Sequence, residues 1–268
     1  LKFPAQAPKN KELEYANSCV TEYIGCHIFN NVGINAQETL LGTYEKNGVI
    51  KIVVACKDFT SPGIVLQDFA SLKPVIDSGH SGYGTELSDI MRAMEDQTAF
   101  PPALLQQHFW NVFIVDALIG NWDRHNGNWG FLYNTATDEI AIAPVYDCGS
   151  CLYPQADEAI MRDTIDKQPE EIFALSQSLF PALGQWQKIN YFDFISSLEN
   201  ADCSKALKRI LPKINMDAIF RIVDETPFIS DLQKQFYKTM LQTRKERILD
   251  FAMEKLRKRE KSKELEAR

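Results

Sequence analysis

The stretch ALLQQHFWNVFIVDALIG, residues 103–120, constrains the fold of this chain more than any other, because it is apolar almost all round. A helix with apolar side chains on every face must be surrounded by protein, so this stretch predicts a buried helix. It contains Asp116, and an unpaired buried carboxylate would be costly. We therefore expect Asp116 to hydrogen-bond the backbone of the following loop or the side chain of Arg124.

A polar loop, NWDRHNGNWGF at residues 121–131, follows this helix directly. Asn, Gly and Asp are ordinary turn residues, so the loop has a bland interpretation as a solvated turn. A second compact cluster, PVYDCGS, comes about twenty residues later and contains Asp147. The alternative interpretation is a catalytic loop that holds a base and a metal ligand at fixed spacing.

Composition limits the classes of protein to consider. At 268 residues the chain has the length of one large domain or two small ones. Its 45% hydrophobic and 24% charged residues are typical of a folded protein. A formal net charge of −7 disfavours binding to nucleic acid through bulk charge, since phosphate neutralisation needs a basic surface. No run of 18 apolar residues occurs, so we expect no membrane span.

The cysteines allow a metal or redox interpretation that the rest of the sequence does not favour. Cys148 and Cys151 form a C-x-x-C, which occurs in redox pairs and in halves of zinc sites. No second C-x-x-C accompanies it, and the four His form no H-x(3–5)-H pair. We expect the six cysteines to be reduced structural thiols, as in a cytosolic-type protein.

The first 60 residues predict a small α+β layer. Apolar side chains at three-to-four spacing predict a helix over residues 12–33, with Gly33 as its C-terminal stop. Residues 37–60 alternate around the turn residues Asn47-Gly48, which predicts a β-hairpin. The chain opens at LKFPAQAP as if a strand were already under way, so we expect the native protein to have residues upstream.

The remaining pattern predicts a larger, mainly helical part. Residues 60–85 look loop-rich, and residues 85–96 predict a helix with Thr85 as its N-cap. Two short apolar runs, 129–134 and 139–147, predict a second hairpin that ends at Asp147. Further helices are expected near residues 169–179, 191–199, 203–210, 215–224 and 230–262.

Asp123, Asn128 and Asp147 are of residue types and in an order that suit phosphoryl transfer, although the first two could merely shape a turn and Asp147 could cap the next segment. The reaction needs a carboxylate near the attacking hydroxyl, oxygen ligands for Mg²⁺ and a cation on the phosphates. Mg²⁺ prefers carboxylate and amide oxygens and keeps several waters, so one Asn and one Asp can suffice. The D-x(4)-N … D-x-G order is typical of kinases, in which the Asn and the second Asp hold the metal.

The motifs resemble a known family. The loop DRHNGN is similar to the D-R-H-N-x-N catalytic loop of phosphatidylinositol kinases, and DCGS stands where their D-F-G stands. TEYIGCHI, QETLLGTY, IVVACKDF and DCGSCLYPQAD resemble the cell-translocating kinase A family of HipA-like serine/threonine kinases. The resemblance runs from residue 1 to about residue 255. It implies an α+β bilobal kinase fold, with an N-terminal lobe at 1–59 and a C-terminal lobe at 60–268, that uses ATP and Mg²⁺.

The resemblance also implies roles for the residues that match the motifs. Asp123 would be the catalytic aspartate, with Asn128 and Asp147 as metal ligands. His125 would assist catalysis near the phosphates, or it would only tie the loop to neighbouring backbone.

The N-terminal lobe would bind the nucleotide. Lys2 would contact the phosphates, with Glu22 as its helix partner and Glu14 as the alternative. Residues 55–59 would form the hinge, where backbone groups of Cys56 and Asp58 would meet the adenine and Asp58 would lie near the ribose. Tyr146 would line the nucleotide pocket or serve as core packing.

Three functions remain in competition. The first is a serine/threonine protein kinase that also phosphorylates itself, with Ser78, Ser81 or Thr85 as acceptors. The second is a small-molecule or lipid kinase, and the third is a nucleotide-binding protein of toxin–antitoxin type without transfer activity. The family has a glycine-containing phosphate loop before the lysine strand, and this chain begins after that position.

The resemblance further implies a bacterial cytoplasmic protein, with secretion or translocation into host cells as the alternative. An antitoxin-like or host protein would be a partner besides ATP and the protein substrate. The basic tail from residue 255 reads as a nuclear-import sequence or as a solvated helix end.

Overall fold

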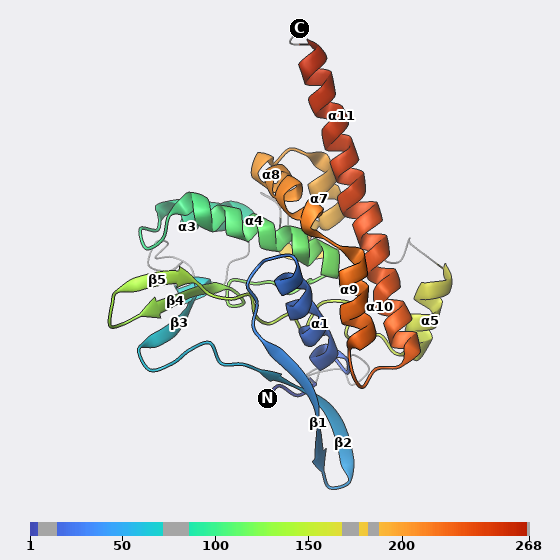
Figure 1. Cartoon of the computed structure of the whole chain (residues 1–268). Helices are drawn as coiled ribbons and strands as arrows, with labels where there is room; N and C mark the ends of the chain where they lie inside the picture. Colours follow the sequence, from blue (N-terminus) through green and yellow to red (C-terminus); the bar gives the residue numbers. More distant parts are fainter. Residues whose placement is uncertain (5–14, 72–85, 168–176, 182–187, 267–268) are drawn as a thin grey trace.

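The computed structural model describes residues 1–4, 15–71, 86–167, 177–181 and 188–266. At its N-terminal end, helix α1 (Ser18–Asn31) packs on the hairpin of β1 (Thr39–Lys46) and β2 (Val49–Cys56) (Figure 1). The helix begins later than predicted, because the amide of Asn17 donates to the carbonyl of Pro154 instead of continuing a helix. It ends as predicted, with Gly33 at a φ of 80°.

The first hairpin has the predicted turn. Asn47 and Gly48 both have positive φ, 53° and 75°, as a two-residue turn between twisted strands requires. Lys2 pairs with Val54 of β2 through two backbone hydrogen bonds of 2.8 and 3.1 Å, so the first residues extend the sheet. Cys19, Leu41 and Val54 form a small core between this sheet and α1.

A second sheet has the antiparallel order β3-β4-β5, built from β3 (Ile64–Asp68), β4 (Gly130–Asn134) and β5 (Glu139–Ile142). The prediction of a loop at residues 60–85 is wrong for β3, while residues 72–85 lie outside the described part. Those outside residues include the predicted acceptors Ser78 and Ser81 and the predicted N-cap Thr85. The last strand ends at Ile142 instead of residue 147, although Val145 still forms a bridge with Ala36.

Helix α4 (Pro102–Ile119) is the buried helix that the sequence predicts, and α3 (Leu87–Asp96) lies beside it. Every residue of α4 from Val112 to its end is buried. Its side chains pack on the C-terminal helices through aromatic pairs, such as Trp110 stacked on Phe194 with ring centroids 5.7 Å apart. Gly120 ends the helix in the left-handed conformation, with a φ of 65°. The loop at residues 121–131, which the sequence predicts to be catalytic, therefore starts from the end of a largely buried helix.

The C-terminal part is mainly helical, as predicted. Its elements are α5 (Glu158–Lys167), β6 (Gln177–Pro181), β7 (Lys188–Asn190), α7 (Tyr191–Ser197), α8 (Ala201–Ile210), η2 (Leu211–Lys213), α9 (Met216–Glu225), α10 (Asp231–Arg244), the π-helical η3 (Lys245–Asp250) and α11 (Phe251–Glu266). The predicted helix 169–179 is wrong at residues 177–179, which belong to β6. Its residues 169–176 lie outside the described part.

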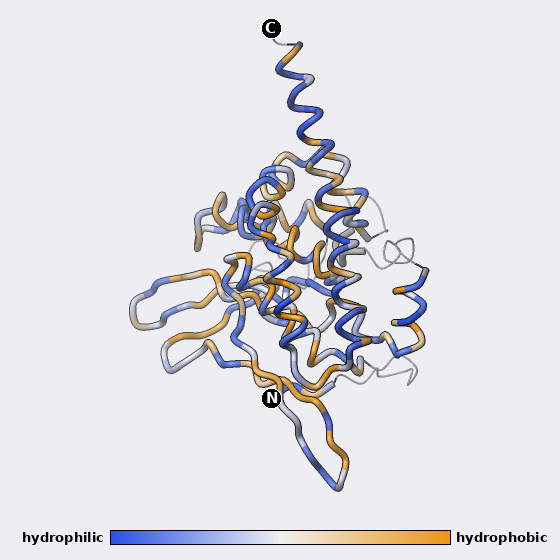
Figure 2. The backbone as a smooth tube through the Cα atoms, turned by 45° about the vertical axis from the view of Figure 1, so that its right-hand side comes forward, coloured by the Kyte–Doolittle hydropathy of each residue, from blue (hydrophilic) through white to orange (hydrophobic). Residues whose placement is uncertain are grey.

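The predicted long helix at residues 230–262 is present as α10, η3 and α11 in continuous succession, with one π-helical segment in the middle. The far end of α11 projects from the body and is strongly hydrophilic (Figures 1 and 2). Among the described residues, no helix has the length and apolar character needed to cross a bilayer. The division into lobes at residue 59 stays a prediction.

Candidate active site

A polar cavity of about 250 Å³ lies where α1, the first strand residues, the loop after α4 and the segment after β5 meet. It brings together Lys2, Glu22, Asp123 and Asp147, which are four of the predicted site residues. The full lining consists of Lys2, Phe3, Tyr15, Ser18, Cys19, Glu22, Val54, Asp123, Asp147, Gly149 and Ser150. Charged groups from four separate segments therefore converge on one space.

The ammonium group of Lys2 lies between two carboxylates. Its Nζ is 3.2 Å from Oε1 of Glu22 and 3.0 Å from Oδ1 of Asp147. Burial alone would lower the pKa of Lys2, but the charges of Glu22 and Asp147 outweigh it and raise that pKa above its usual value. Glu22 is almost fully buried at 1% exposure, and the positive charge of Lys2 compensates its buried negative charge. The alternative partner, Glu14, lies outside the described residues.

Asp147 and Gly149 lie close against α1. Asp147 adopts a positive φ of 58°, an uncommon conformation for a residue with a side chain. The carbonyl of Gly149 accepts a 2.8 Å hydrogen bond from the Thr21 hydroxyl. A Cβ at Gly149 would lie 3.2 Å from Oε2 of Glu22 and 3.3 Å from the carbonyl of Ser18, so glycine permits this close approach. The helix that carries Glu22 thus fixes the segment that carries Asp147.

The residues of the predicted catalytic loop are held by hydrogen bonds within the loop. Nδ2 of the buried Asn128 donates to the carbonyl of Asp123 at 3.0 Å, and the Asn128 amide donates to the carbonyl of His125 at 2.9 Å. Nδ1 of His125 accepts from the amide of Gly127 at 3.0 Å. His125 does not line the cavity, so its observed contact matches the alternative in which it ties the loop to neighbouring backbone.

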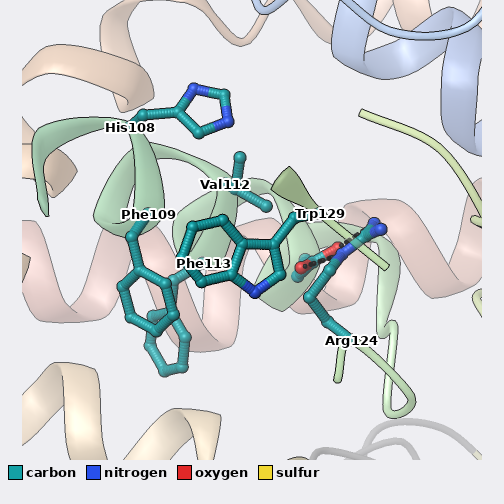
Figure 3. A pocket seen from close by; sticks show the side chains of 7 residues that line it. His108, Phe109, Val112, Phe113, Arg124 and Trp129 are labelled. Carbon is teal, nitrogen blue, oxygen red and sulfur yellow. Dashed lines mark hydrogen bonds and ion pairs between the residues drawn. The ribbon is translucent and has the colours of Figure 1, made fainter. Parts of the chain in front are cut away.

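A buried ion pair anchors the loop to α4. Arg124 places Nε 3.0 Å from Oδ2 and Nη2 3.1 Å from Oδ1 of Asp116, as predicted for that carboxylate. Figure 3 shows Arg124 with its ion pair beside Trp129, at the edge of a small apolar cavity of about 10 Å³ against α4. Burial raises the pKa of Asp116, while the charge of Arg124 and a hydrogen bond from Asn121 oppose that rise.

Arg124 also joins the two segments that carry the site. Its Nη1 donates to the carbonyls of Asn128 at 3.2 Å and Tyr146 at 2.5 Å, and its Nη2 donates to Sγ of Cys148 at 3.5 Å. Asn128 belongs to the catalytic loop, whereas Tyr146 and Cys148 flank Asp147. One buried guanidinium therefore sets the position of the loop relative to the DCG segment.

The predicted hinge residues do not line the polar cavity, although Cys56 is close enough to Lys2 and Glu22 to interact with their charges. Cys56 is the last residue of β2, and neither it nor Asp58 lines the cavity. Oδ1 of the exposed Asp58 accepts from the amide and hydroxyl of Thr60 at 2.8 and 2.7 Å, which lowers the pKa of Asp58. Its side chain is thus engaged in a local turn.

Tyr146 connects the segment after β2 to the loop after α4. Its hydroxyl donates to the carbonyl of Gly127 at 2.9 Å, and its ring lies 5.7 Å from that of Phe59. Burial raises the pKa of this phenol above its usual value. Tyr146 therefore stays neutral near pH 7, and its ring and hydroxyl both have structural contacts.

The structure adds residues that the sequence did not indicate. Tyr15 lines the cavity, and its ring lies 6.1 Å from that of Trp122 in the loop after α4. Trp129 is part of the core instead, with its ring centroid 4.1 Å from that of Phe69 and 5.9 Å from that of Phe109. Nothing in the sequence pattern distinguishes Tyr15 from the aromatic residues of the core.

In the described part of the chain, no three His, Cys, Asp or Glu side chains lie close enough together to bind one metal ion. Cys148 and Cys151 are both buried and unbridged. Sγ of Cys148 accepts from Arg124, and Sγ of Cys151 lies 3.3 Å from the carbonyl of Thr21.

Comparison with known proteins places these features in a family. Residues 1–218 match the HipA-like C-terminal domain. The chain is 46% identical over 256 residues to the serine/threonine-protein kinase CtkA of Helicobacter pylori, covering 94% of this chain and 77% of that protein. The crystal structure of a Helicobacter pylori proinflammatory kinase CtkA superposes with a TM-score of 0.85 and 44% identity, over 96% of this chain and 90% of that one.

A more distant likeness extends to the toxin HipA of Shewanella oneidensis, solved with HipB and operator DNA. It has a TM-score of 0.57 and 16% identity, over 88% of this chain and 57% of that one. At this identity the likeness supports the fold alone. The match over residues 1–218 and the identity over most of the chain show the family. The chain belongs to the HipA-like C-terminal domain family.

Proposed function

We propose that this chain is a serine/threonine protein kinase that transfers the γ-phosphate of ATP to a protein hydroxyl, its own included. The observation that carries the proposal is the convergence of Asp123, Asp147 and the Lys2–Glu22 pair on one polar cavity. The relative that is 46% identical over 94% of this chain is named a serine/threonine-protein kinase, which supports the same reaction.

Asp123 is the group that orients the acceptor hydroxyl. It is partly exposed and lines the cavity, so an incoming side chain can reach it. Its backbone is fixed on both sides, because its amide donates to Oδ1 of Asn121 and its carbonyl accepts from Asn128. A carboxylate held in this way can accept the hydroxyl proton as the acceptor oxygen attacks phosphorus.

Lys2 is the cation for the phosphates. The carboxylates of Glu22 and Asp147 raise its pKa, so it stays protonated at neutral pH. Glu22 is buried and the Lys2 side chain is 43% exposed, so Glu22 holds the lysine from the protein interior at the wall of the cavity. The lysine thereby contributes positive charge where the transferred phosphoryl group carries negative charge.

Asn128 and Asp147 fit a divalent cation such as Mg²⁺ by their chemistry. Both offer oxygen ligands, which hard cations prefer, and Mg²⁺ commonly keeps several waters with only one or two protein ligands. Nδ2 of Asn128 is engaged with Asp123, which leaves Oδ1 as the atom for a cation. Such an ion would neutralise charge on the phosphates. In the structure the carboxylate of Asp147 pairs with the ammonium group of Lys2.

The nucleotide base would meet the segment after β2. Cys56 and the following residues lead from the first hairpin to the β3 sheet, and the rings of Phe59 and Tyr146 lie together there. We assign the adenine contact to backbone groups of Cys56 and Asp58, since the Asp58 carboxylate is engaged with Thr60.

The test is transfer of label from ATP labelled on its γ-phosphate, with Mg²⁺, to a generic protein, a phosphoinositide or a sugar. We expect label on protein, the chain itself included, and none on lipid or sugar. Label on lipid or sugar alone would support the small-molecule or lipid kinase. No label at all with retained ATP binding would support the non-catalytic alternative.

A matched pair of variants ties the label to this site. Asp147→Asn removes a predicted metal ligand, and we expect it to abolish transfer. Asp224→Asn removes a carboxylate that only pairs with Lys238 on the surface, and we expect wild-type transfer. Transfer that survives Asp147→Asn would overturn the site assignment.

A further inference from the structure

Arg244 is a fully buried charged side chain that the site description has not used. It is the last residue of α10, has 1% exposure, and is followed directly by the π-helical segment Lys245–Asp250. π-Helical turns inside α-helices often occur at functional sites. Burying a guanidinium is unfavourable unless it meets hydrogen-bond acceptors, so its contacts indicate what it does.

The guanidinium of Arg244 caps the C-terminal end of α4. Its Nε donates to the carbonyl of Ala117 at 2.8 Å, in the last turn of that helix. The last four carbonyls of a helix have no partner within it, and a positive charge there also meets the negative end of the helix dipole. A Cβ at Gly120 would lie 3.1 Å from Cζ of Arg244, so the helix end and the guanidinium are in direct contact.

Tyr191 continues the contact into the catalytic loop. Its ring lies 6.0 Å from the Arg244 guanidinium, and its hydroxyl donates to the carbonyl of Asn121 at 2.6 Å. The side chain of Asn121 in turn donates to Asp116 at 3.1 Å and accepts from the amide of Asp123 at 3.2 Å. An unbroken series of contacts therefore leads from Arg244 to the backbone of Asp123.

We propose that Arg244 is a positioning residue for Asp123: with Tyr191 it fixes the end of α4 and hence the start of the catalytic loop. The inference rests on the proposed function, because it assigns Asp123 the role of the catalytic aspartate. Arg244 does not line the polar cavity, so it would influence Asp123 only indirectly. It acts through the helix end, from a position more than a hundred residues after the loop.

The chain offers a matched control. Arg209 of α8 also holds α4, through bonds of 3.2 and 3.1 Å from its guanidinium to Oδ1 of Asn111. Asn111 lies in the middle of α4, away from the loop. Arg209→Met therefore removes an arginine that docks the same helix without touching its C-terminal end.

The experiment compares Arg244→Met, Tyr191→Phe and Arg209→Met by kinetics and by hydrogen exchange of residues 119–130. Misplacement of a catalytic group by about 1 Å lowers turnover by up to about 100-fold. We expect Arg244→Met to lower kcat by about 10- to 100-fold with the KM for ATP unchanged. We also expect faster exchange in residues 119–130, and a smaller change of the same kind in Tyr191→Phe. Arg209→Met should match the wild type in both readouts.

Wild-type kcat and wild-type exchange in Arg244→Met would overturn the inference, as would equal loss in Arg209→Met. If Arg244→Met does not fold, Tyr191→Phe tests the same series of contacts, because it removes only the hydroxyl that bonds the carbonyl of Asn121. Wild-type kcat and exchange in Tyr191→Phe would then overturn the inference. Failure of the proposed function is distinguishable, since wild-type protein would then show no transfer. The exchange of residues 119–130 would still report whether Arg244 positions the loop.

Discussion

The Asp116–Arg124 pair allows a quantitative test of how the catalytic loop is held. Arg124→Met keeps the length of the side chain but removes its charge and donors. It leaves Asp116, which is 1% exposed, as a buried carboxylate without its cation. Breaking a buried pair in this way destabilises a protein by about 3–5 kcal/mol. The carbonyls of Asn128 and Tyr146 also lose a donor, at about 1 kcal/mol each.

We therefore expect Arg124→Met to reduce the free energy of unfolding by at least about 5 kcal/mol at pH 7. The double variant Asp116→Asn/Arg124→Met has no uncompensated charge at this position. It should be more stable than Arg124→Met by about 2 kcal/mol or more, because the two sites interact directly. The distinctive outcome is that adding Asp116→Asn to Arg124→Met restores part of the lost stability.

The pH dependence gives the same reasoning a second check. Burial raises the pKa of Asp116, and Arg124 opposes that rise, so Arg124→Met should raise the pKa further. A carboxyl group whose pKa is higher in the folded state than in the unfolded state binds more protons when folded. The free energy of unfolding then increases as pH falls through that range. The defect of Arg124→Met should therefore shrink toward acidic pH, whereas the double variant should lack this recovery.

Urea unfolding followed by circular dichroism, at several pH values, measures all these differences. A loss of less than about 1 kcal/mol in Arg124→Met would refute the reasoning, because an exposed pair contributes only that much. A double variant less stable than Arg124→Met would refute it equally.

Three further predictions follow from single positions. In Gly130→Ala the new Cβ would lie 2.2 Å from the carbonyl oxygen of Gln67, so β3 must shift away from β4. We expect the free energy of unfolding in urea to fall by about 1–3 kcal/mol, and wild-type stability would contradict the close approach of the two strands. Lys2→Met should lower kcat by about 100-fold or more. The loss should be the same from about pH 6 to pH 9, because the raised pKa of Lys2 keeps it charged in the wild type over this range; a loss that varies with pH would contradict the assignment of Lys2 as the phosphate cation. Burial, with Arg124 nearby, lowers the pKa of His108 to about 4, below its unfolded value of about 6.5, so the free energy of unfolding should fall as pH drops from about 6.5 to 4. The fall should be weaker in His108→Gln, and an identical pH dependence in that variant would contradict the prediction.

The sequence predicted best the elements that local pattern determines. Helix α4 follows from apolar residues on every face and a terminal glycine, and the first hairpin follows from Asn47-Gly48. Because α4 is buried, we predicted a partner for the Asp116 carboxylate, and Arg124, one of the two partners considered, forms the ion pair. The grouping of Lys2, Glu22, Asp123 and Asp147 came from motif spacing and resemblance, and their roles remain part of the proposal.

The parts that sequence could not predict depend on contacts between distant segments. Strand β3 is five residues long, shows no clear alternation, and is stabilised by pairing with β4 more than sixty residues later. Arg244 bonds the backbone carbonyl of Ala117, and a backbone acceptor leaves no mark in the sequence. His125 had two roles open, and only the geometry of the loop shows Nδ1 bonded to Gly127. Asp58 likewise has a turn role that its position alone did not indicate.

The most direct test of the account is a comparison of phosphoryl transfer and nucleotide binding in Asp123→Asn. The substitution keeps the shape of the side chain and removes the carboxylate that we propose orients the acceptor. We predict that transfer from ATP to protein falls by a factor of about 100 or more, while the Kd for ATP with Mg²⁺ stays within about twofold of wild type. Transfer at the wild-type rate would contradict the assignment of Asp123 and with it the proposed mechanism.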